Sequence, residues 1–175
     1  MSSAFIVNIT RFLALLLMQV LVFKKISNGF TLSSFNYLNV FIYPIFIMLL
    51  PVRIPHALSI LLAFVFGISI DWFYDSLGVH AGACVFTAFV RPYILSILEP
   101  RGGYPLVGGP TQHVLGMRWF LRFSAISLLI HLLVYFSIQY FSFVYIINIL
   151  ISTLVSFVFS MLFIIMYQFL LNPKE

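Results

Sequence analysis

The sequence predicts an all-α integral membrane protein, a bundle of six transmembrane helices. Hydrophobic residues make up 63% of its 175 residues and charged residues only 7%, against about 25% charged in an ordinary soluble domain. A soluble protein of this composition would expose large apolar patches and aggregate. Soluble enzymes are therefore excluded. The nine basic residues are scattered along the chain, which does not fit a nucleic-acid-binding surface.

The spacing of the apolar segments gives the number of spans. A helix rises about 1.5 Å per residue, so a hydrocarbon core of about 30 Å needs about 20 residues. One polytopic domain, 1–175, is expected, with spans at about 5–23, 35–50, 56–74, 79–98, 117–139 and 145–171. Residues 123–173 contain no Lys, Arg, Asp or Glu. Because one helix of that length would reach about 76 Å, the chain must turn near the polar residues Gln139, Tyr140 and Ser142.

Three spans have features of their own. The first carries Asn8 and Arg11 and is followed by no small-x-small cleavage site, so it is expected to remain as an anchor. The second is short and contains Pro44, which predicts a kink or a tilted partial span. The sixth is long enough to tilt.

The basic residues predict the orientation. With six spans both termini lie on one side of the membrane, and seven of the nine basic residues fall on or near that side; only Lys24 and Lys25 fall on the other. The positive-inside rule then places both termini in the cytoplasm. The loop 99–116 would also be cytoplasmic. It holds five glycines and three prolines, so an irregular connector or contact loop is expected rather than a nucleotide site.

Asp71, Asp75 and His80, with Arg91 and Pro92 later in the fourth span, form the candidate polar or partner site. The two aspartates are four residues apart near the end of the third span, which would place them on one helix face. His80 follows after a short turn. Intramembrane carboxylates are candidates for proton, ion or ligand sites. Near the outer interface they can equally serve polar packing or contact a partner.

Basic residues mark the opposite ends of the helices. Arg91 precedes Pro92 late in the fourth span, where it could snorkel to the interface, cap backbone carbonyls released by the proline, or bind a lipid phosphate. Arg118 and Arg122 lie on one face of the fifth span. Together with Arg101 they form a candidate cytoplasmic interface for anionic lipid or a partner.

Small and polar residues are candidates for helix packing. His131 is expected to be a hydrogen-bonded packing residue, and Gln19 is one of several amide side chains suited to interhelical hydrogen bonds. Two stripes of small residues would let helices approach closely: Gly78 and Gly82 in the fourth span, and Ser152, Ser156 and Ser160 in the sixth.

The sequence holds no recognisable catalytic or cofactor motif. HExxH, GxSxG and the Gly-x-Gly-Asp motif of intramembrane aspartyl proteases are absent. The single cysteine, Cys84, excludes an internal disulfide and a cysteine-based metal site. We therefore expect a protein that is not an enzyme and has no cofactor or metal.

Residues 67–120 resemble a known family. The stretches Gly67-Ile-Ser-Ile-Asp-Trp-Phe-Tyr-Asp-Ser-Leu-Gly-Val-His80 and Ala88-Phe-Val-Arg-Pro-Tyr-Ile-Leu95 are similar to the MreD family of bacterial rod-shape-determining proteins. The loop Glu99-Pro-Arg-Gly-Gly-Tyr-Pro105 and the stretch Gly116-Met-Arg-Trp-Phe120 fit the same family.

The resemblance implies a function that composition alone does not. MreD-like proteins are multi-pass subunits of the inner-membrane elongation complex that supports cell shape and peptidoglycan synthesis. They associate with the bitopic protein MreC and, indirectly, with MreB filaments, RodA and a class B penicillin-binding protein. Their fold is similar to the substrate-binding subunits of energy-coupling-factor transporters. The family has no catalytic residues to transfer.

Two other functions remain open at this stage. One is a small-molecule-binding membrane subunit of a transporter, which the fold similarity allows. The other is a lipid-modifying enzyme at the outer interface, for which Asp71, Asp75 and His80 could supply the acid and base.

Overall fold

The computed structural model describes residues 2–29, 38–105 and 109–170, and these residues form helices and connections without strands. Five helices of this part are long and apolar enough to cross a membrane. The expected all-helical, multi-pass membrane architecture is therefore confirmed in this coarser form, with five helical spans. Residues 35–37 of the second predicted span, 106–108 of the loop and 171 of the last span lie outside the described residues.

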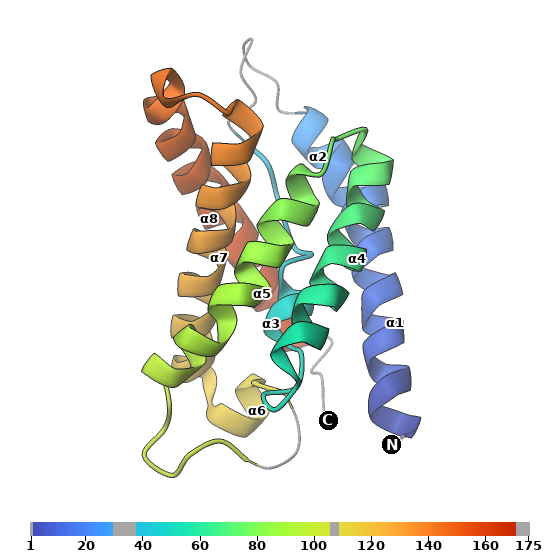
Figure 1. The fold of residues 1–175 in the computed structure, drawn as a ribbon, viewed down its shortest axis with the longest axis vertical. Coiled ribbons are helices and arrows are strands. Elements are labelled where there is room, and N and C mark those ends of the chain that lie inside the picture. Colours follow the sequence, from blue (N-terminus) through green and yellow to red (C-terminus); the bar gives the residue numbers. More distant parts are fainter. Residues whose placement is uncertain (1, 30–37, 106–108, 171–175) are drawn as a thin grey trace.

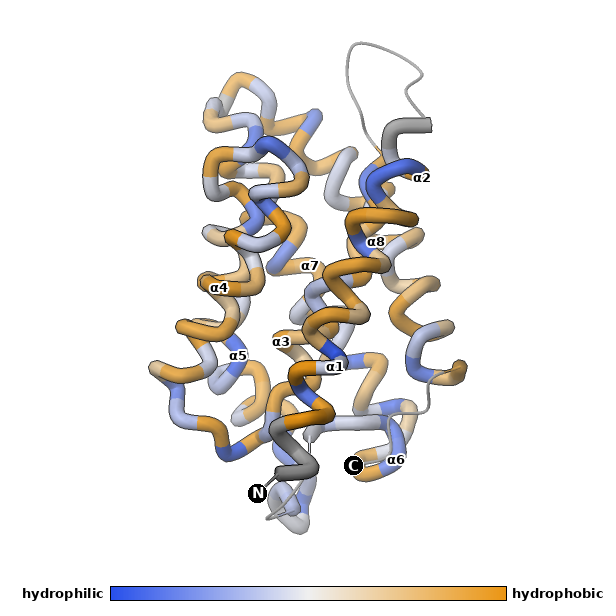
Figure 2. The backbone as a smooth tube through the Cα atoms, turned by 90° about the vertical axis from the view of Figure 1, so that its right-hand side faces the viewer, coloured by the Kyte–Doolittle hydropathy of each residue, from blue (hydrophilic) through white to orange (hydrophobic). Residues whose placement is uncertain are grey.

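The five spans run roughly along one axis (Figure 1). The first, Ile6–Ser27, combines α1 (Ser2–Met18), a π-helical turn η1 (Gln19–Phe23) and the start of α2 (Lys24–Gly29). The other four are α4 (His56–Tyr74), α5 (Val79–Ile97), α7 (Met117–Tyr140) and α8 (Ile146–Leu170). Figure 2 shows that hydrophobic residues dominate the lengths of α1, α4 and α8, as a lipid environment requires.

The predicted second helical span is wrong. Residues 38–44 are not helical, and α3 covers only Ile45–Met48. Pro44 stands at the N-terminal boundary of α3, where its missing N–H costs nothing. Residues 38–50, which we call the interior segment, run among the helices (Figure 1). Every side chain from Val40 to Leu50 is buried, so this segment is apolar because it lies inside the protein and not because it faces lipid.

The turns at both ends of the bundle have local causes. α7 ends at Tyr140, and Phe141 takes a left-handed conformation before the short 3-10 helix η2 (Phe143–Tyr145). At the other end, the loop 99–116 is less irregular than predicted, because it contains the helix α6 (Gln112–Leu115). Gly116, at φ 84°, ends α6 and precedes α7. α1 begins and α8 ends toward the end of the bundle where α6 lies (Figure 1).

Candidate functional site

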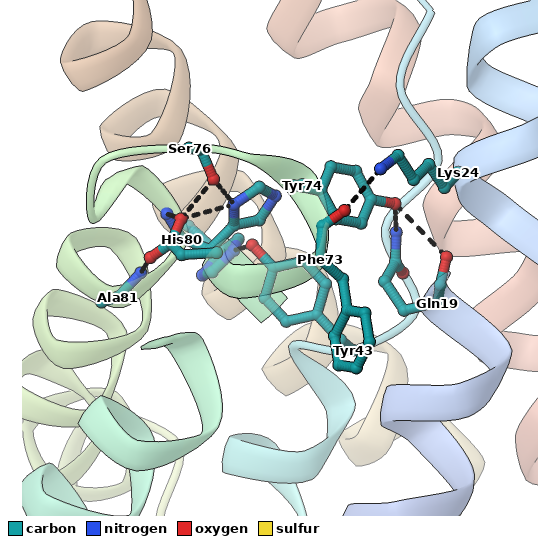
Figure 3. Close-up of polar contacts among 10 residues, drawn as sticks. Gln19, Lys24, Tyr43, Phe73, Tyr74, Ser76, His80 and Ala81 are labelled. Atoms are coloured by element: carbon teal, nitrogen blue, oxygen red, sulfur yellow. Dashed lines mark hydrogen bonds and ion pairs between the residues drawn. The ribbon is translucent and has the colours of Figure 1, made fainter. Parts of the chain in front are cut away.

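Asp71 lies in the last turn of α4 and caps the helix that follows, α5. Its Oδ2 accepts a hydrogen bond from the Ala81 amide at 2.8 Å, and its Oδ1 accepts one from the His80 amide at 3.0 Å. Oδ1 also receives the Ser76 hydroxyl and His80 Nδ1 (Figure 3). The first amides of a helix have no partner within it and carry partial positive charge. A carboxylate from the preceding helix therefore supplies the cap of α5.

Glycines and left-handed residues bring Asp71 to that position. The residue in the capping position of α5 is Gly78, at φ 81°, which has no side chain to cap the helix itself. A Cβ on Gly67 would lie 2.5 Å from the Cα of Ala81, so α4 and α5 can approach this closely only with glycine there. Gly67 and Gly78 thus allow the tight helical hairpin that brings the Asp71 carboxylate to the first amides of α5.

His80 is fully buried in a ring of aromatic side chains. Ring centroids of Tyr74, Tyr135 and Tyr43 lie 4.7, 4.9 and 5.7 Å from that of His80. Nδ1 is 2.9 Å from the Asp71 carboxylate, whereas Nε2 is buried and has no hydrogen-bond partner among the described residues. A proton on Nδ1 can be donated to the Asp71 carboxylate, and in a neutral ring the lone pair then lies on Nε2.

A second histidine lies deeper in the bundle, on α7. The Tyr43 hydroxyl is 2.7 Å from His131 Nε2, and Thr87 Oγ1 is 2.8 Å from His131 Nδ1. Thr87 donates its own proton to the Ala83 carbonyl at 2.7 Å, so its oxygen accepts from Nδ1–H. Nε2 of the neutral ring then accepts from Tyr43. His131 therefore holds the interior segment to α5 and α7, in keeping with its expected packing role.

Side chains from the spans bind the backbone of the interior segment. Ser156 and Ser160 of α8 accept hydrogen bonds from the amides of Asn39 and Phe41, at 3.1 and 2.8 Å. Ser27 accepts one from the Val40 amide at 3.1 Å. An extended backbone cannot satisfy its own N–H groups, and lipid offers no water in their place. The serine stripe thus packs against this chain's own interior.

Gln19 hydrogen-bonds both an amide and a carbonyl of the same segment. Its Oε1 accepts from the Ile42 amide at 3.0 Å, and its Nε2 donates to the Val40 carbonyl at 3.0 Å and to the Tyr74 hydroxyl at 2.9 Å. Lys24, one turn further on, donates to the Phe73 carbonyl and lies 5.1 Å above the Tyr74 ring (Figure 3). The π-helical turn η1 starts at Gln19, where α1 is tied to α4 and to the interior segment.

Two buried arginines bind the carbonyls at the end of the interior segment. Arg91 of α5 donates to the Leu50 carbonyl and, over longer distances of 3.4–3.5 Å, to those of Met48 and Pro51. Arg11 of α1 donates to the Leu49 carbonyl at 3.3 Å. Arg91 thus caps carbonyls, as one of the sequence-based interpretations held, but those of another segment rather than those freed by Pro92.

The other predicted site residues are dispersed. Asp75 is not on the same face as Asp71, because α4 ends at Tyr74 and Asp75 is an exposed residue with φ 52°. Pro92 is exposed within α5. Gly78 has open space around it, whereas a Cβ on Gly82 would lie 2.9 Å from Ile138 of α7. Arg101, Arg118 and Arg122 are exposed at the end of the bundle that carries α6.

Sequence reasoning missed several members of these networks. Ser76 lies four residues before His80, a spacing that could have indicated it, and Tyr43 adjoins the proline that breaks the predicted span. No pattern in the sequence indicates that Thr87, four residues after Ala83 on α5, belongs to the network of His131. Comparison of the chain with protein-family models, with curated proteins and with solved structures gives no match.

Proposed function

We propose that this chain is a non-catalytic, multi-pass subunit of the bacterial cell-wall elongation complex. In this role it docks an MreC-like bitopic partner in the inner membrane, and so supports peptidoglycan synthesis and cell shape. MreB filaments, RodA and a class B penicillin-binding protein would be indirect partners. The proposal rests on the resemblance of residues 67–120 to the MreD family and on the burial and hydrogen bonding of the polar side chains in that stretch.

The main support for the proposal is that these polar side chains form hydrogen bonds with other groups of the same chain. Asp71 is 4% exposed and accepts four hydrogen bonds, two of them from backbone amides of α5. Arg91 is 4% exposed and donates to backbone carbonyls. A carboxylate and a guanidinium that are bonded in this way stabilise the fold of the protein and point to a structural rather than a catalytic role. What remains for a partner is the apolar lipid-facing surface and the exposed basic end.

The exposed arginines at one end of the bundle support the proposed orientation in the membrane. Arg53, Arg101, Arg118 and Arg122 are exposed near the ends of the spans on the side where α6 lies. With the positive-inside rule, this side and both termini are cytoplasmic. The chain would then cross the membrane six times, once through the interior segment, which is helical only at Ile45–Met48. This pattern is compatible with the proposed similarity to energy-coupling-factor substrate-binding subunits.

The transporter and enzyme alternatives fit the geometry less well. A ligand-binding subunit of the predicted kind needs Asp71 and His80 on a pocket open to the outer face, but these side chains are 4% and 0% exposed. A lipid-modifying enzyme needs an acid and a base that water can reach. Asp75 is exposed but stands apart from the other two residues.

Depletion of the protein in a rod-shaped host tests the proposal. Rods should become spheres, and an MreC-like protein should co-purify with the tagged chain from native membranes. Unchanged morphology without such a partner would refute the proposal.

One pair of variants separates a structural His80 from a reactive one. His80→Asn keeps an amide N–H near the position of Nδ1, where it can donate to Asp71, but has no counterpart of Nε2. A docking subunit should therefore still support rod shape with His80→Asn, whereas His80→Leu leaves Asp71 without that donor and should lower the protein level in membranes. Loss of shape in His80→Asn cells with normal protein levels would instead indicate chemistry or ligand binding at Nε2.

A further inference from the structure

One face of α7 changes from basic to apolar along the helix. The exposed residues among 117–130 are Arg118, Arg122, Ile126 and Leu129. Because a helix turns by about 100° per residue, these four positions fall within about 80° of one another around its axis. The two arginines therefore continue a face on which the next exposed side chains are hydrocarbon.

The length of α7 places the two arginines at the level of the phospholipid headgroups. From Arg122 to the end of the helix at Tyr140 the rise is about 27 Å, which nearly spans a hydrocarbon core of about 30 Å. Arg122 then lies at the edge of the core. Arg118 lies about 6 Å further along the axis, within a headgroup layer that is about 5–8 Å thick.

The start of α7 is held against the end of α5, so this part of the helix is fixed in place. Trp119 Nε1 donates a hydrogen bond to the Leu98 carbonyl at 2.6 Å, and the Trp119 ring stacks on Phe123 with centroids 5.0 Å apart. The Tyr104 ring meets the edge of Trp119 at 5.8 Å. Tryptophan and tyrosine are the residues that favour the membrane–water interface, which agrees with the depth of the arginines.

The charge of the two arginines is not balanced by a carboxylate in the described part of the chain. The one ion pair among those residues joins Asp71 to His80, and neither belongs to α7. Glu99, the acid closest in sequence, lies beside the turn that follows α5, where its Oε1 would be 3.9 Å from a Cβ on Gly103. An anion from outside the chain can therefore pair with both guanidinium groups.

The position of the arginines favours a lipid over an acidic protein segment. Arg122 is one turn from Ile126 on the same face, and a peptide bound at this depth would have to satisfy its backbone against lipid tails. Guanidinium groups pair well with phosphate, and a headgroup that carries its own cation would be repelled. We propose that Arg118 and Arg122 bind the headgroup phosphate of an anionic phospholipid, whose acyl chains lie against the apolar part of the same face.

Lipid binding to the purified full-length chain tests the site. Native mass spectrometry would compare phosphatidylglycerol with phosphatidylcholine of the same acyl chains, and we expect preferential, saturable retention of phosphatidylglycerol. Arg118→Gln combined with Arg122→Gln should weaken that retention about 25-fold, or about fivefold for each basic side chain near an anionic headgroup. The matched control, Lys25→Gln with Arg53→Gln, removes the same net charge at two exposed positions outside α7 and should leave retention unchanged.

Three results of this experiment would overturn the proposal. Equal retention of the two lipids by the wild type would show that the headgroup charge is not recognised. An equal loss in the arginine pair and in the control pair would show an effect of net charge rather than of a site. Displacement of phosphatidylglycerol by inorganic phosphate at constant ionic strength would show that the free anion is bound, because phosphate has no acyl chain to contact Ile126 or Leu129.

Photocrosslinking in intact cells tests what covers this face of α7. The photoreactive residue p-benzoylphenylalanine in place of Ile126, which is 39% exposed, should give lipid adducts that leave the gel mobility unchanged. A discrete protein-sized adduct would overturn the proposal by identifying a partner helix on this face, and a doubled mass would do so by identifying a second copy of the chain. Failure of the lipid site would leave the proposed role in cell elongation standing, because depletion and co-purification test that role separately.

Discussion

The interior segment and α8 are both strongly apolar, yet they satisfy their backbones in opposite ways. α8 runs as a continuous helix from Ile146 to Leu170, so its amides and carbonyls bond one another. The interior segment, 38–50, is helical only at Ile45–Met48. Besides the backbone bonds around this short helix, it takes its partners from side chains on α1, η1, α2, α5 and α8. The comparison explains why buried polar residues occur on otherwise apolar spans: they complete the hydrogen bonding of a different segment.

The difference predicts which polar residues stabilise the fold. Those that bond the interior segment should be costly to remove, and matched residues that face outward or bond their own helix should not. The single thiol, Cys84, is fully buried. Its reaction with a thiol-reactive dye on heating therefore reports unfolding of the purified protein.

The largest effect is expected for Arg91→Met. This change keeps much of the apolar stem but leaves the Leu50 carbonyl, and those near it, without their donor. Hydrogen bonds from charged donors contribute about 1.5–3 kcal/mol each, and buried unpaired groups are costly, so we expect a loss of about 3–4 kcal/mol. The matched control is Arg122→Met, on the exposed face of α7, which should change stability by less than about 0.5 kcal/mol. Similar melting of the two variants would contradict a clamping role for Arg91.

Gln19→Leu should come next. It leaves the Val40 carbonyl and the Ile42 amide unpaired, and because both were bonded to a neutral amide side chain, we expect a loss of about 2–3 kcal/mol in all. Hydrogen exchange with mass spectrometry should show faster exchange of the amide of Ile42, while exchange in the middle of α8 stays slow. Gln139→Leu, at an exposed position of α7, is the control. Unchanged exchange at residue 42 in Gln19→Leu would show that the interior segment does not depend on this side chain.

Ser160→Ala should have the smallest effect of the three. It removes one acceptor, that of the Phe41 amide, and should lower stability by about 1–2 kcal/mol. Ser137→Ala is the matched control, because the Ser137 hydroxyl is exposed and donates to the Leu133 carbonyl of its own helix. Equal effects of the two serine changes would mean that the stripe on α8 acts through helix packing alone.

Much of the architecture follows from residue patterns. The composition indicates a membrane protein, and α4 lies at 56–74, where the apolar run between the basic and acidic residues places it. The turn after α7 lies at the polar residues that mark it. The second span could not be predicted in this way, because residues 40–50 are apolar whether they face lipid or the protein interior. Pro44 was the one local sign of a break in this span.

The candidate site could likewise be predicted only in part from the sequence. Asp71 and His80 can be named from the sequence because charged and titratable residues are rare in spans, but the same argument does not distinguish Asp75 from Asp71. Whether a carboxylate at this turn faces solvent or caps a helix depends on the close contact of Gly67 with Ala81, which joins residues of two different helices. The sequence marks Gln19 as a candidate for an interhelical hydrogen bond and the serines as a small-residue packing stripe, but it does not indicate that both bind a non-helical backbone.

The sequence by itself determined that this is a membrane protein and how long most of its helices are. Both follow from local properties of the chain: the hydrophobicity of each apolar run and the rise of a helix per residue. The tertiary structure alone decided which polar groups meet. Asp71 caps α5, and Arg11, Arg91, Gln19 and the serines bind the interior segment. The physical reason is that every buried backbone group needs a partner, and an extended segment inside a membrane protein can find one only on neighbouring elements.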